Sequence, residues 1–180
     1  MRGPFLVGER IRLRPHEPED ASVFVAYFSD PQVTQFLARR DVPSLEEEQK
    51  WLQGKAVDPN SIGWTIEFEG QPVGVVGLDI DWQNATATVG TFIGEKSLWG
   101  QGIATEMGLL VAGYVFGELP LRKIKSGYID ENVASGRLQA SAGLVEVGRW
   151  RAEHFRNGKW CDHVLTELMR EDWEKLSSDS

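Results

Sequence analysis

Residues 97–107 read Ser-Leu-Trp-Gly-Gln-Gly-Ile-Ala-Thr-Glu-Met and join a predicted strand to a predicted helix. Gly100 and Gly102 let the backbone turn tightly and approach a ligand without a Cβ in the way. The first amides of a helix have no acceptor within the helix and carry the positive end of its dipole. A strand, a glycine-rich loop and a helix in this order predict a cradle for a pyrophosphate. A tight connection that uses glycine for its geometry alone is the alternative.

Two common phosphate-binding motifs do not fit this loop. The P-loop ends in Gly-Lys-Ser or Gly-Lys-Thr, and no such sequence follows Gly102. The dinucleotide-binding fingerprint places its third glycine or alanine at a spacing that residues 100–105 do not provide. It also needs a parallel sheet, whereas the short connections between the neighbouring strands favour antiparallel pairing.

Hydrophobic periodicity outward from the loop predicts a mixed α/β domain of the α+β class. Strands are predicted at residues 10–14, 64–68, 73–81, 85–93, 123–129, 146–155 and 160–168. Helices are predicted after Asp20, after Ser44, where Glu47 completes a capping box, and over residues 102–116 and 132–142. Residues 171–180 are acidic and rich in serine, and we expect them to fray. Residues 1–180 are expected to form a single domain with a core of about 10–173.

Composition restricts the possible partners. The chain of 180 residues has 19 Lys and Arg against 27 Asp and Glu, so its formal charge is −8. Nucleic acids and membranes are not expected partners, because neutralising many phosphates needs clustered cations. Cys161 is the single cysteine, which excludes an internal disulfide and a cysteine-based zinc site, and we expect no metal. No apolar run approaches the roughly 18 residues of a membrane helix, so a soluble, cytoplasmic domain is expected.

Three motifs in order resemble those of one family. Residues 99–104, Trp-Gly-Gln-Gly-Ile-Ala, lie over a pyrophosphate loop of the form Arg/Gln-x-x-Gly-x-Gly/Ala, with Trp in the first place. Residues 130–135, Asp-Glu-Asn-Val-Ala-Ser, followed by Gly143-Leu144, resemble a second signature, and residues 157–165 resemble a closing hairpin. The chain thus resembles the GNAT superfamily of acetyl-CoA-dependent N-acetyltransferases, in particular the RimJ/RimL-like branch that acetylates ribosomal-protein N-termini.

This resemblance implies a GNAT-like fold, with a central, mostly antiparallel twisted sheet flanked by helices. Its strands 4 and 5 splay apart, and acetyl-CoA, the cosubstrate, enters the gap. The implied contacts of the pantetheine and acetyl group are the backbone of Phe92, Ile93 and Gly94, and the side chains of Asn132 and Ser135. Arg137 and Lys96 are implied near the phosphates, and a homodimer is a further expectation. The implied pyrophosphate cradle, with Trp99 packed beneath it, consists of the amides around Gly100, Gln101, Gly102, Ile103, Ala104 and Thr105.

Acetyl transfer to an amine requires an oxyanion donor, a base for the protonated amine and a partner for the thiolate. The backbone N–H of Ile93 is the candidate oxyanion donor, and Ser135 is a candidate partner for the thiolate. The chain departs from the family at the other positions. Thr88 stands where the branch often has a glutamate base, and Gln139 stands where other branches have a tyrosine acid.

Asp79 and Asp81 are the candidate substitutes for the missing base. They alternate with Leu78 and Ile80, so both point to one face of their strand. If that face lines the acceptor cleft, these carboxylates could bind a cationic amine or pass its proton through water. A solvated strand end before the turn at residues 83–84 is the alternative.

Other titratable and aromatic side chains are expected to be structural. His154 and His163 lie in the closing hairpin, and His16 follows a proline in a predicted loop. Trp51 is expected in the core. The run at residues 46–48, Glu-Glu-Glu, is expected on a solvated helix face, although the early helices form one wall of the acceptor site in the family.

Two functions follow from the sequence. The first is an N-acetyltransferase that transfers the acetyl group of acetyl-CoA to a primary amine by direct attack in a ternary complex. The acceptor would be a protein N-terminus or a small amine such as an amino acid, a polyamine or an antibiotic. The second is a catalytically weak CoA-binding domain with a sensing or regulatory role, which the missing glutamate and tyrosine leave open.

Overall fold

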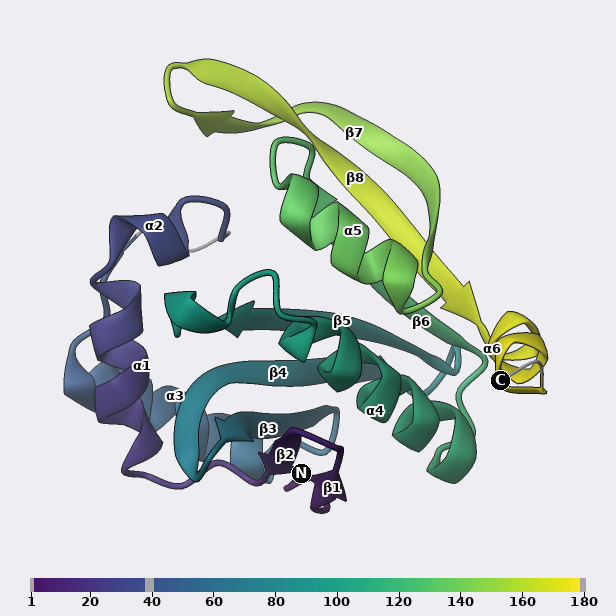
Figure 1. Ribbon diagram of the computed structural model, residues 1–180, viewed down its shortest axis with the longest axis horizontal. Helices are drawn as coiled ribbons and strands as arrows, with labels where there is room; N and C mark the ends of the chain where they lie inside the picture. The colour runs from purple at the N-terminus through teal and green to yellow at the C-terminus, as the bar shows by residue number, and fades with distance from the viewer. Residues whose placement is uncertain (1, 38–40, 179–180) are drawn as a thin grey trace.

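The computed structural model describes residues 2–37 and 41–178, which form an eight-stranded sheet with helices on both faces (Figure 1). The strand order across the sheet is β1-β2-β3-β4-β5-β6-β8-β7. In chain order the elements are β1 (Leu6–Val7), β2 (Ile11–Arg14), α1 (Asp20–Phe28), α2 (Pro31–Thr34), α3 (Leu45–Val57), β3 (Ser61–Phe68), β4 (Gln71–Asp81), β5 (Thr86–Ile93), η1 (Lys96–Leu98), α4 (Ile103–Glu118), β6 (Lys123–Ile129), α5 (Val133–Ser141), β7 (Val145–Arg156), β8 (Lys159–Met169) and α6 (Arg170–Ser178).

The sheet is split between β5 and β6. These two strands are parallel, whereas the other neighbouring strands are antiparallel. They pair only where Thr86, Ala87 and Thr88 meet residues 123–125. Beyond this point β5 stays with β4 and β6 stays with β8, so the two halves diverge (Figure 1). The expected splay is confirmed, and the two strands carry the labels β5 and β6 because the short β1 is counted first.

The two faces of the sheet belong to different clusters of buried side chains. The alternation of β4 sends Val76, Leu78 and Ile80 toward α4, while Val75 points to the face that α1 and α3 cover. The longest helix in the described part of the chain, α4, has 16 residues. None of the described helices is long and apolar enough to cross a membrane.

Local signals in the sequence set the helix starts. The Ser44 hydroxyl accepts a hydrogen bond from the Glu47 amide at 3.2 Å, and the Glu47 carboxylate accepts one from the Ser44 amide at 2.7 Å. This confirms the predicted capping box at the start of α3. At α5 the Asn132 side chain accepts from the Ser135 amide at 3.1 Å. Capping therefore fixes the place of both helices that later border the site.

The expectation of a frayed C-terminal tail at residues 171–180 is wrong for residues 171–178, which belong to α6; residues 179–180 lie outside the described part of the chain. Trp173 packs against Phe116 of α4, with ring centroids 6.3 Å apart. The Arg170 guanidinium donates to the carbonyl oxygens of Leu119 and Leu121, each at 2.7 Å from Nη2, and also to that of Phe116. These contacts order the segment despite its polar composition, because they bind it to the end of α4.

Candidate active site

The loop between β5 and α4 has the shape that its glycines predict. Gly100 and Gly102 have φ angles of 74° and 81°, and nothing lies within 4 Å of the position that either Cβ would take. The amides of Gly100, Gly102 and residues 103–105 have no acceptor among the described residues. A row of unpaired amides at the positive end of a helix fits a pyrophosphate, so the loop fits the phosphate end of acetyl-CoA.

Gln101 does not share this role, because its amide donates to the Leu98 carbonyl oxygen at 3.3 Å. Its own carbonyl oxygen accepts from Arg10 Nη1 at 2.6 Å, and the Arg10 amide donates to the Glu106 carboxylate on α4 at 2.9 Å. Nothing in the sequence signals this role of Arg10, because the contact spans about ninety residues of the chain and only the tertiary fold brings its ends together. Arg10 thus fixes the loop from the bend that precedes β2.

Trp99 lies differently from the expectation that it packs beneath the cradle. Its side chain is 44% exposed, and its Nε1 donates to the Ile93 carbonyl oxygen at 2.9 Å. The loop is therefore tied to the last residue of β5.

The two cations expected near the phosphate loop are not directed at its unpaired amides. Lys96 pairs with the Asp30 carboxylate at 2.6 Å and also donates to Gln32. Arg137 is exposed on α5 and does not line the cavity described below. The groups at this loop that fit a phosphate are thus main-chain donors, which a chain of negative net charge can supply as well as any other.

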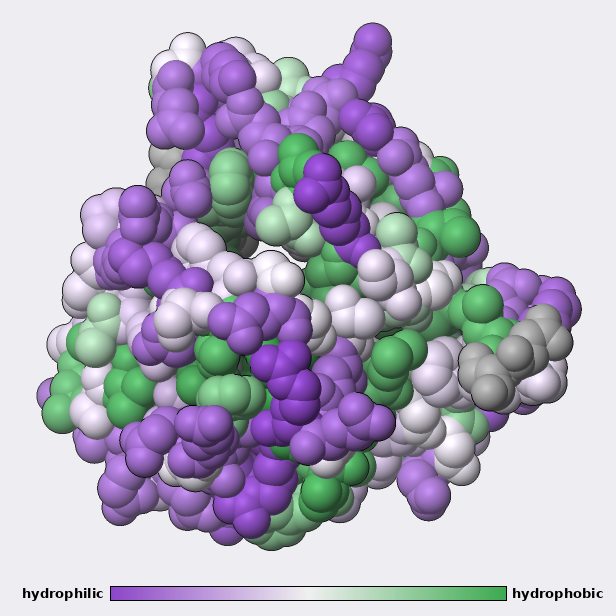
Figure 2. Space-filling view, in the orientation of Figure 1, coloured by the Kyte–Doolittle hydropathy of each residue, from purple (hydrophilic) through white to green (hydrophobic). Residues whose placement is uncertain are grey.

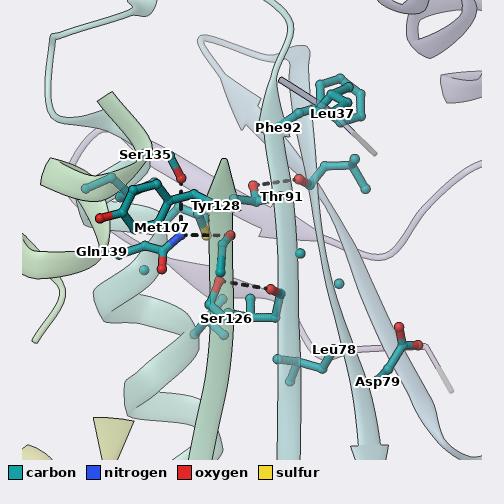
Figure 3. Close-up of a pocket in the computed structure, with 18 of the residues that line it drawn as sticks. Leu37, Leu78, Asp79, Thr91, Phe92, Met107, Ser126, Tyr128, Ser135 and Gln139 are labelled. Carbon is teal, nitrogen blue, oxygen red and sulfur yellow. Dashed lines mark hydrogen bonds between the residues drawn. The ribbon is translucent and has the colours of Figure 1, made fainter. Parts of the chain in front are cut away.

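A cavity of about 520 Å³ occupies the split between β5 and β6. The surface is hollowed in this region between the part formed by α5, β7 and β8 and the rest of the molecule (Figure 2). Figure 3 shows Met107, Ser135 and Gln139 on one side of the split and Asp79 on β4 on the other. The cavity therefore connects the α4–α5 face with the α1–α3 face. Its polar lining includes Ser135 and Gln139 from α5, and His16, Glu48, Lys55 and Asp79 from the opposite face.

The backbone of β5 turns alternate residues toward this cavity. The Gly94 amide donates to the Val73 carbonyl oxygen of the neighbouring strand β4 at 2.8 Å. Because bonded and non-bonded pairs alternate in an antiparallel ladder, Phe92 also bonds β4, and Ile93 turns its backbone groups toward β6. Of the three residues expected to present their backbone to the cofactor, Ile93 turns its backbone groups into the split, whereas Phe92 and Gly94 bond β4. The Phe92 ring instead packs on Phe28 with centroids 4.9 Å apart.

A hydrogen-bond network orients Ser135. Gln139 is only 7% exposed, and its Nε2 donates to the Ser135 hydroxyl at 3.1 Å and to the Gly127 carbonyl oxygen at 3.2 Å. The Thr166 hydroxyl donates to Gln139 Oε1 at 2.5 Å. Since Ser135 accepts in this network, its own hydroxyl hydrogen can be donated to a ligand. The residue in the place of the family tyrosine is therefore a positioning group for Ser135 (Figure 3).

Three glycines form a row across the sheet on the α1–α3 side of the cavity. Gly63 of β3 pairs directly with Gly77 of β4, which pairs directly with Gly90 of β5. All three line the cavity. A Cβ on Gly77 would meet its first atom at 3.7 Å, and a Cβ on Gly90 would meet none within 4 Å. His16 covers the Cβ position of Gly63, with its Nε2 at 2.6 Å, so the open space for a substrate lies over Gly77 and Gly90.

The two aspartates of β4 have different surroundings. Asp79 lines the cavity and accepts from Lys55 Nζ at 2.5 Å. Asp81 does not line it: its carboxylate accepts from the amide and the side chain of Asn84 at 3.0 and 2.7 Å, which lowers its pKa. The alternative of a strand end before a turn is therefore the better description of Asp81. Thr88 is exposed and also lies outside the cavity lining.

The sequence missed Glu48 and Trp51 as lining residues. Glu48 is only 2% exposed, in contrast to the expected solvated face, while Trp51 is 43% exposed instead of buried in the core. Both line the cavity from α3. The signal in the sequence was weak, because α3 has no strong amphipathic pattern and its orientation depends on the sheet beneath it.

The histidines also depart from expectation. His16 is half-buried against Gly63, and its Nδ1 lies 2.9 Å from the Thr65 hydroxyl. Burial lowers its pKa from 6.5 to about 4. His154 and His163 also line the cavity. The described residues contain no group of three or more His, Cys, Asp or Glu side chains that could hold a metal ion.

A sheet opened between two parallel strands, beside the amides of a helix N-terminus, is the arrangement of an acyl-CoA-dependent acyltransferase. Residues 10–145, more than half of the chain, match the family model described as an acetyltransferase (GNAT) domain. The chain therefore belongs to the GNAT acetyltransferase family, and it is an N-acetyltransferase that uses acetyl-CoA.

Relatives cover nearly the whole chain. The sequence is 27% identical over 177 residues to p20, an uncharacterized N-acetyltransferase of Bacillus licheniformis, covering 93% of this chain and 97% of that protein. It is 33% identical over 86 residues to the ribosomal protein uS5-alanine N-acetyltransferase of Escherichia coli, covering 47% and 43%. The spermidine N-acetyltransferase of Vibrio cholerae, solved with CoA and spermine, superimposes with a TM-score of 0.84 at 21% identity, covering 92% and 98%. This last likeness confirms the fold.

Proposed function

We propose that the acceptor is a cationic primary amine that enters the cavity from the α1–α3 side, while acetyl-CoA lies on the α4–α5 side. The observation that carries this proposal is the cavity through the split sheet, which connects Ser135 to Asp79 and Glu48. Carboxylates at the acceptor side favour a cation, and the net charge of −8 attracts one from solution. The same charge argues against nucleic acid as a partner.

Main-chain amides and side-chain donors of this chain would bind acetyl-CoA and stabilise the charges that form during transfer. The Ile93 amide points toward β6 and would stabilise the oxyanion that forms as the amine attacks the thioester carbonyl. The Ser135 hydroxyl would donate to the departing thiolate sulfur, since Gln139 holds it in place. Asn132 would meet the pantetheine arm. The pyrophosphate would bind the free amides of the loop, with Arg137 as an exposed cation nearby.

The shape of the cavity on its α1–α3 side indicates the class of acceptor. The open space over Gly77 and Gly90 suits an extended, unbranched amine, such as a peptide N-terminus or a polyamine. The similar proteins include one whose name gives a protein alanine as the acceptor, the ribosomal protein uS5-alanine N-acetyltransferase, and one whose name gives a polyamine, the spermidine N-acetyltransferase. We further propose that residues 1–180 act as one catalytic domain in the cytoplasm. Exposed aromatic side chains on β7 and β8, such as Trp150 and Trp160, support a homodimer.

The test is a screen of amines with acetyl-CoA, reading the free thiol of CoA as it appears. Spermidine, amino-acid amides and peptides with N-terminal alanine form the panel. We expect saturable turnover with at least one extended amine. Saturable acetyl-CoA binding without thiol release from any amine would favour the sensing domain instead. Absence of acetyl-CoA binding at millimolar concentration would contradict both functions.

A further inference from the structure

Two histidines form a hydrogen-bonded pair at the cavity. His154 Nε2 and His163 Nδ1 lie 3.0 Å apart. Trp150 stacks on His163, with ring centroids 5.4 Å apart and planes 23° from parallel. Both imidazoles are half-buried and line the cavity. The hydrogen bond to His154 and the stacked Trp150 thus orient His163, and both histidines still border the cavity.

The position of His163 on the sheet puts it at the point where the strands part. Its Nε2 lies 2.3 Å from where a Cβ on Gly127 would be, so the imidazole covers this glycine of β6. The neighbouring Ser126 donates to the Val89 carbonyl oxygen at 3.2 Å, which is the last bond across the split. The Gly127 carbonyl oxygen also accepts from Gln139 Nε2, in the network that orients Ser135. His163 therefore lies across one strand from the proposed acetyl position.

We propose that His163, hydrogen-bonded to His154, removes the proton from the bound ammonium group of the acceptor. The inference rests on the proposed function and deepens it, because a protonated amine has no lone pair with which to attack a thioester. It assigns the base that the family places at the position of Thr88.

The proton balance is simple. The ammonium N–H bond breaks, the proton binds a bare imidazole nitrogen, and the amine keeps the electron pair that then forms the new C–N bond. A single hydrogen bond between two neutral imidazoles uses one N–H and one bare nitrogen, so each tautomer leaves one outer nitrogen bare. The pair accepts one proton without breaking this bond. In the arrangement in which His163 Nδ1–H donates to His154 Nε2, the bare nitrogen is His163 Nε2. This nitrogen takes the proton and returns it to water once the product has left, so the pair regains its starting tautomer.

The surroundings of His163 favour its neutral form before substrate arrives. Burial, followed by the influence of His154, lowers the pKa of His163, while Glu153 on β7 raises it. The residues of β6 that face the ring, Gly127 and Ile129, carry no charge, and Lys125 lies further along that strand. Across the cavity Asp79 and Lys55 pair with each other.

The two aspartates of β4 are less suited to this step. The Asp79 carboxylate is held by Lys55, and Asp81 is held by Asn84 outside the cavity. A neutral imidazole is a better match for proton transfer at neutral pH than an ion-paired carboxylate.

The experiment measures kcat/KM for the best amine of the screen from pH 6 to pH 10, in the wild type, His163→Asn and His154→Asn. For His163→Asn we expect a loss of about 100-fold below the pKa of the amine, because a general base contributes a factor of this order. The deficit should shrink above that pKa, where the amine arrives unprotonated. For His154→Asn we expect a smaller loss and an acid limb shifted to higher pH, because the neighbour that lowers the pKa of His163 is removed.

Affinity for CoA and the melting temperature are measured in the same variants to confirm folding. A folded His163→Asn variant with the pH profile of the wild type would overturn the inference. Should that variant not fold, His154→Asn decides: a shifted acid limb supports the base, and an unshifted one rules it out. A wild type that turns over no amine contradicts the proposed function itself, which is a different result from an unchanged profile in the variants.

Discussion

Gly102 decides whether the cofactor loop can take its observed shape. Its φ of 81° lies in the left-handed region, where a β-branched residue is strongly disfavoured. We predict that Gly102→Val weakens CoA binding at least about tenfold, since strain of 1–2 kcal/mol falls on the loop that presents the amides. Isothermal titration with CoA measures this loss.

Gly117 provides the matched control in the same helix. It has no left-handed φ, and nothing lies within 4 Å of its Cβ position. Gly117→Ala should leave CoA affinity unchanged and stabilise the fold by roughly 0.5–1 kcal/mol. Equal CoA affinity in Gly102→Val and the wild type would mean that the pyrophosphate binds elsewhere.

Gln139 joins stability to catalysis through Ser135. We predict that Gln139→Leu lowers the free energy of unfolding by about 1–3 kcal/mol, because the Thr166 hydroxyl and the Gly127 carbonyl oxygen lose their buried partner. The same variant should lower kcat while the Kd for CoA changes little. Urea unfolding and steady-state kinetics measure the two effects. A stability loss with an unchanged kcat would make the network purely structural.

At the level of elements, Gly77 of β4 and Gly90 of β5 set the depth of the acceptor groove. We predict that Gly90→Val raises the KM for the amine at least about tenfold, which corresponds to 1.4 kcal/mol, because two methyl groups fill the groove. The Kd for CoA should not change, since the cofactor approaches from the other face. Gly90 has no left-handed φ and an open Cβ position, so the strand tolerates the substitution.

Gly148→Val on β7 is the control for this prediction. Its Cβ would lie 3.9 Å from Leu165, an ordinary contact, and Gly148 does not line the cavity. Its kinetics should match those of the wild type. A raised KM in both variants, or in neither, would remove the glycine row from acceptor binding.

Elements were also the level at which the sequence was most informative. Periodicity of two, the capping box at Ser44 and the glycines after β5 are local signals, because each depends on residues a few positions apart. The wrong expectation for residues 171–178 shows the limit of such signals. Arg170 and Trp173 order α6 by contacts with α4 and its C-terminal connection, which lie about fifty residues away along the chain.

At the level of the whole molecule, His16 links stability to pH. Its folded pKa of about 4 lies below its unfolded value of 6.5, so the folded state prefers the neutral ring. The resulting stability is complete above pH 6.5 and falls as the pH drops toward 4, because the unfolded chain takes up the proton first. The shift predicts a loss of about 3 kcal/mol over this range.

Urea unfolding between pH 4 and pH 7 tests this dependence. The variant His16→Gln should show a flatter profile than the wild type over the same range. Identical slopes in the two proteins would mean that His16 is not half-buried as described. Below pH 4 a further loss is expected from Asp20: burial acts to raise the pKa of this carboxyl, but hydrogen bonds from Arg14, the Glu17 amide and Thr65 outweigh burial and lower it.

The sequence by itself determined the order of the strands from β2 to β8 and of the helices α1, α3, α4 and α5, the glycine-rich loop, the capping box of α3, and the family to which they belong. These features are local, and short-range backbone chemistry is sufficient to specify them. Only the tertiary structure decided what surrounds the reacting groups. It brought His163 over Gly127, buried Glu48 beside the cavity, separated Asp81 from Asp79 and set Arg10 against the loop. Such placements depend on how a twisted sheet divides between β5 and β6, and on which helix covers each face. Residues far apart in the chain become neighbours only through that packing.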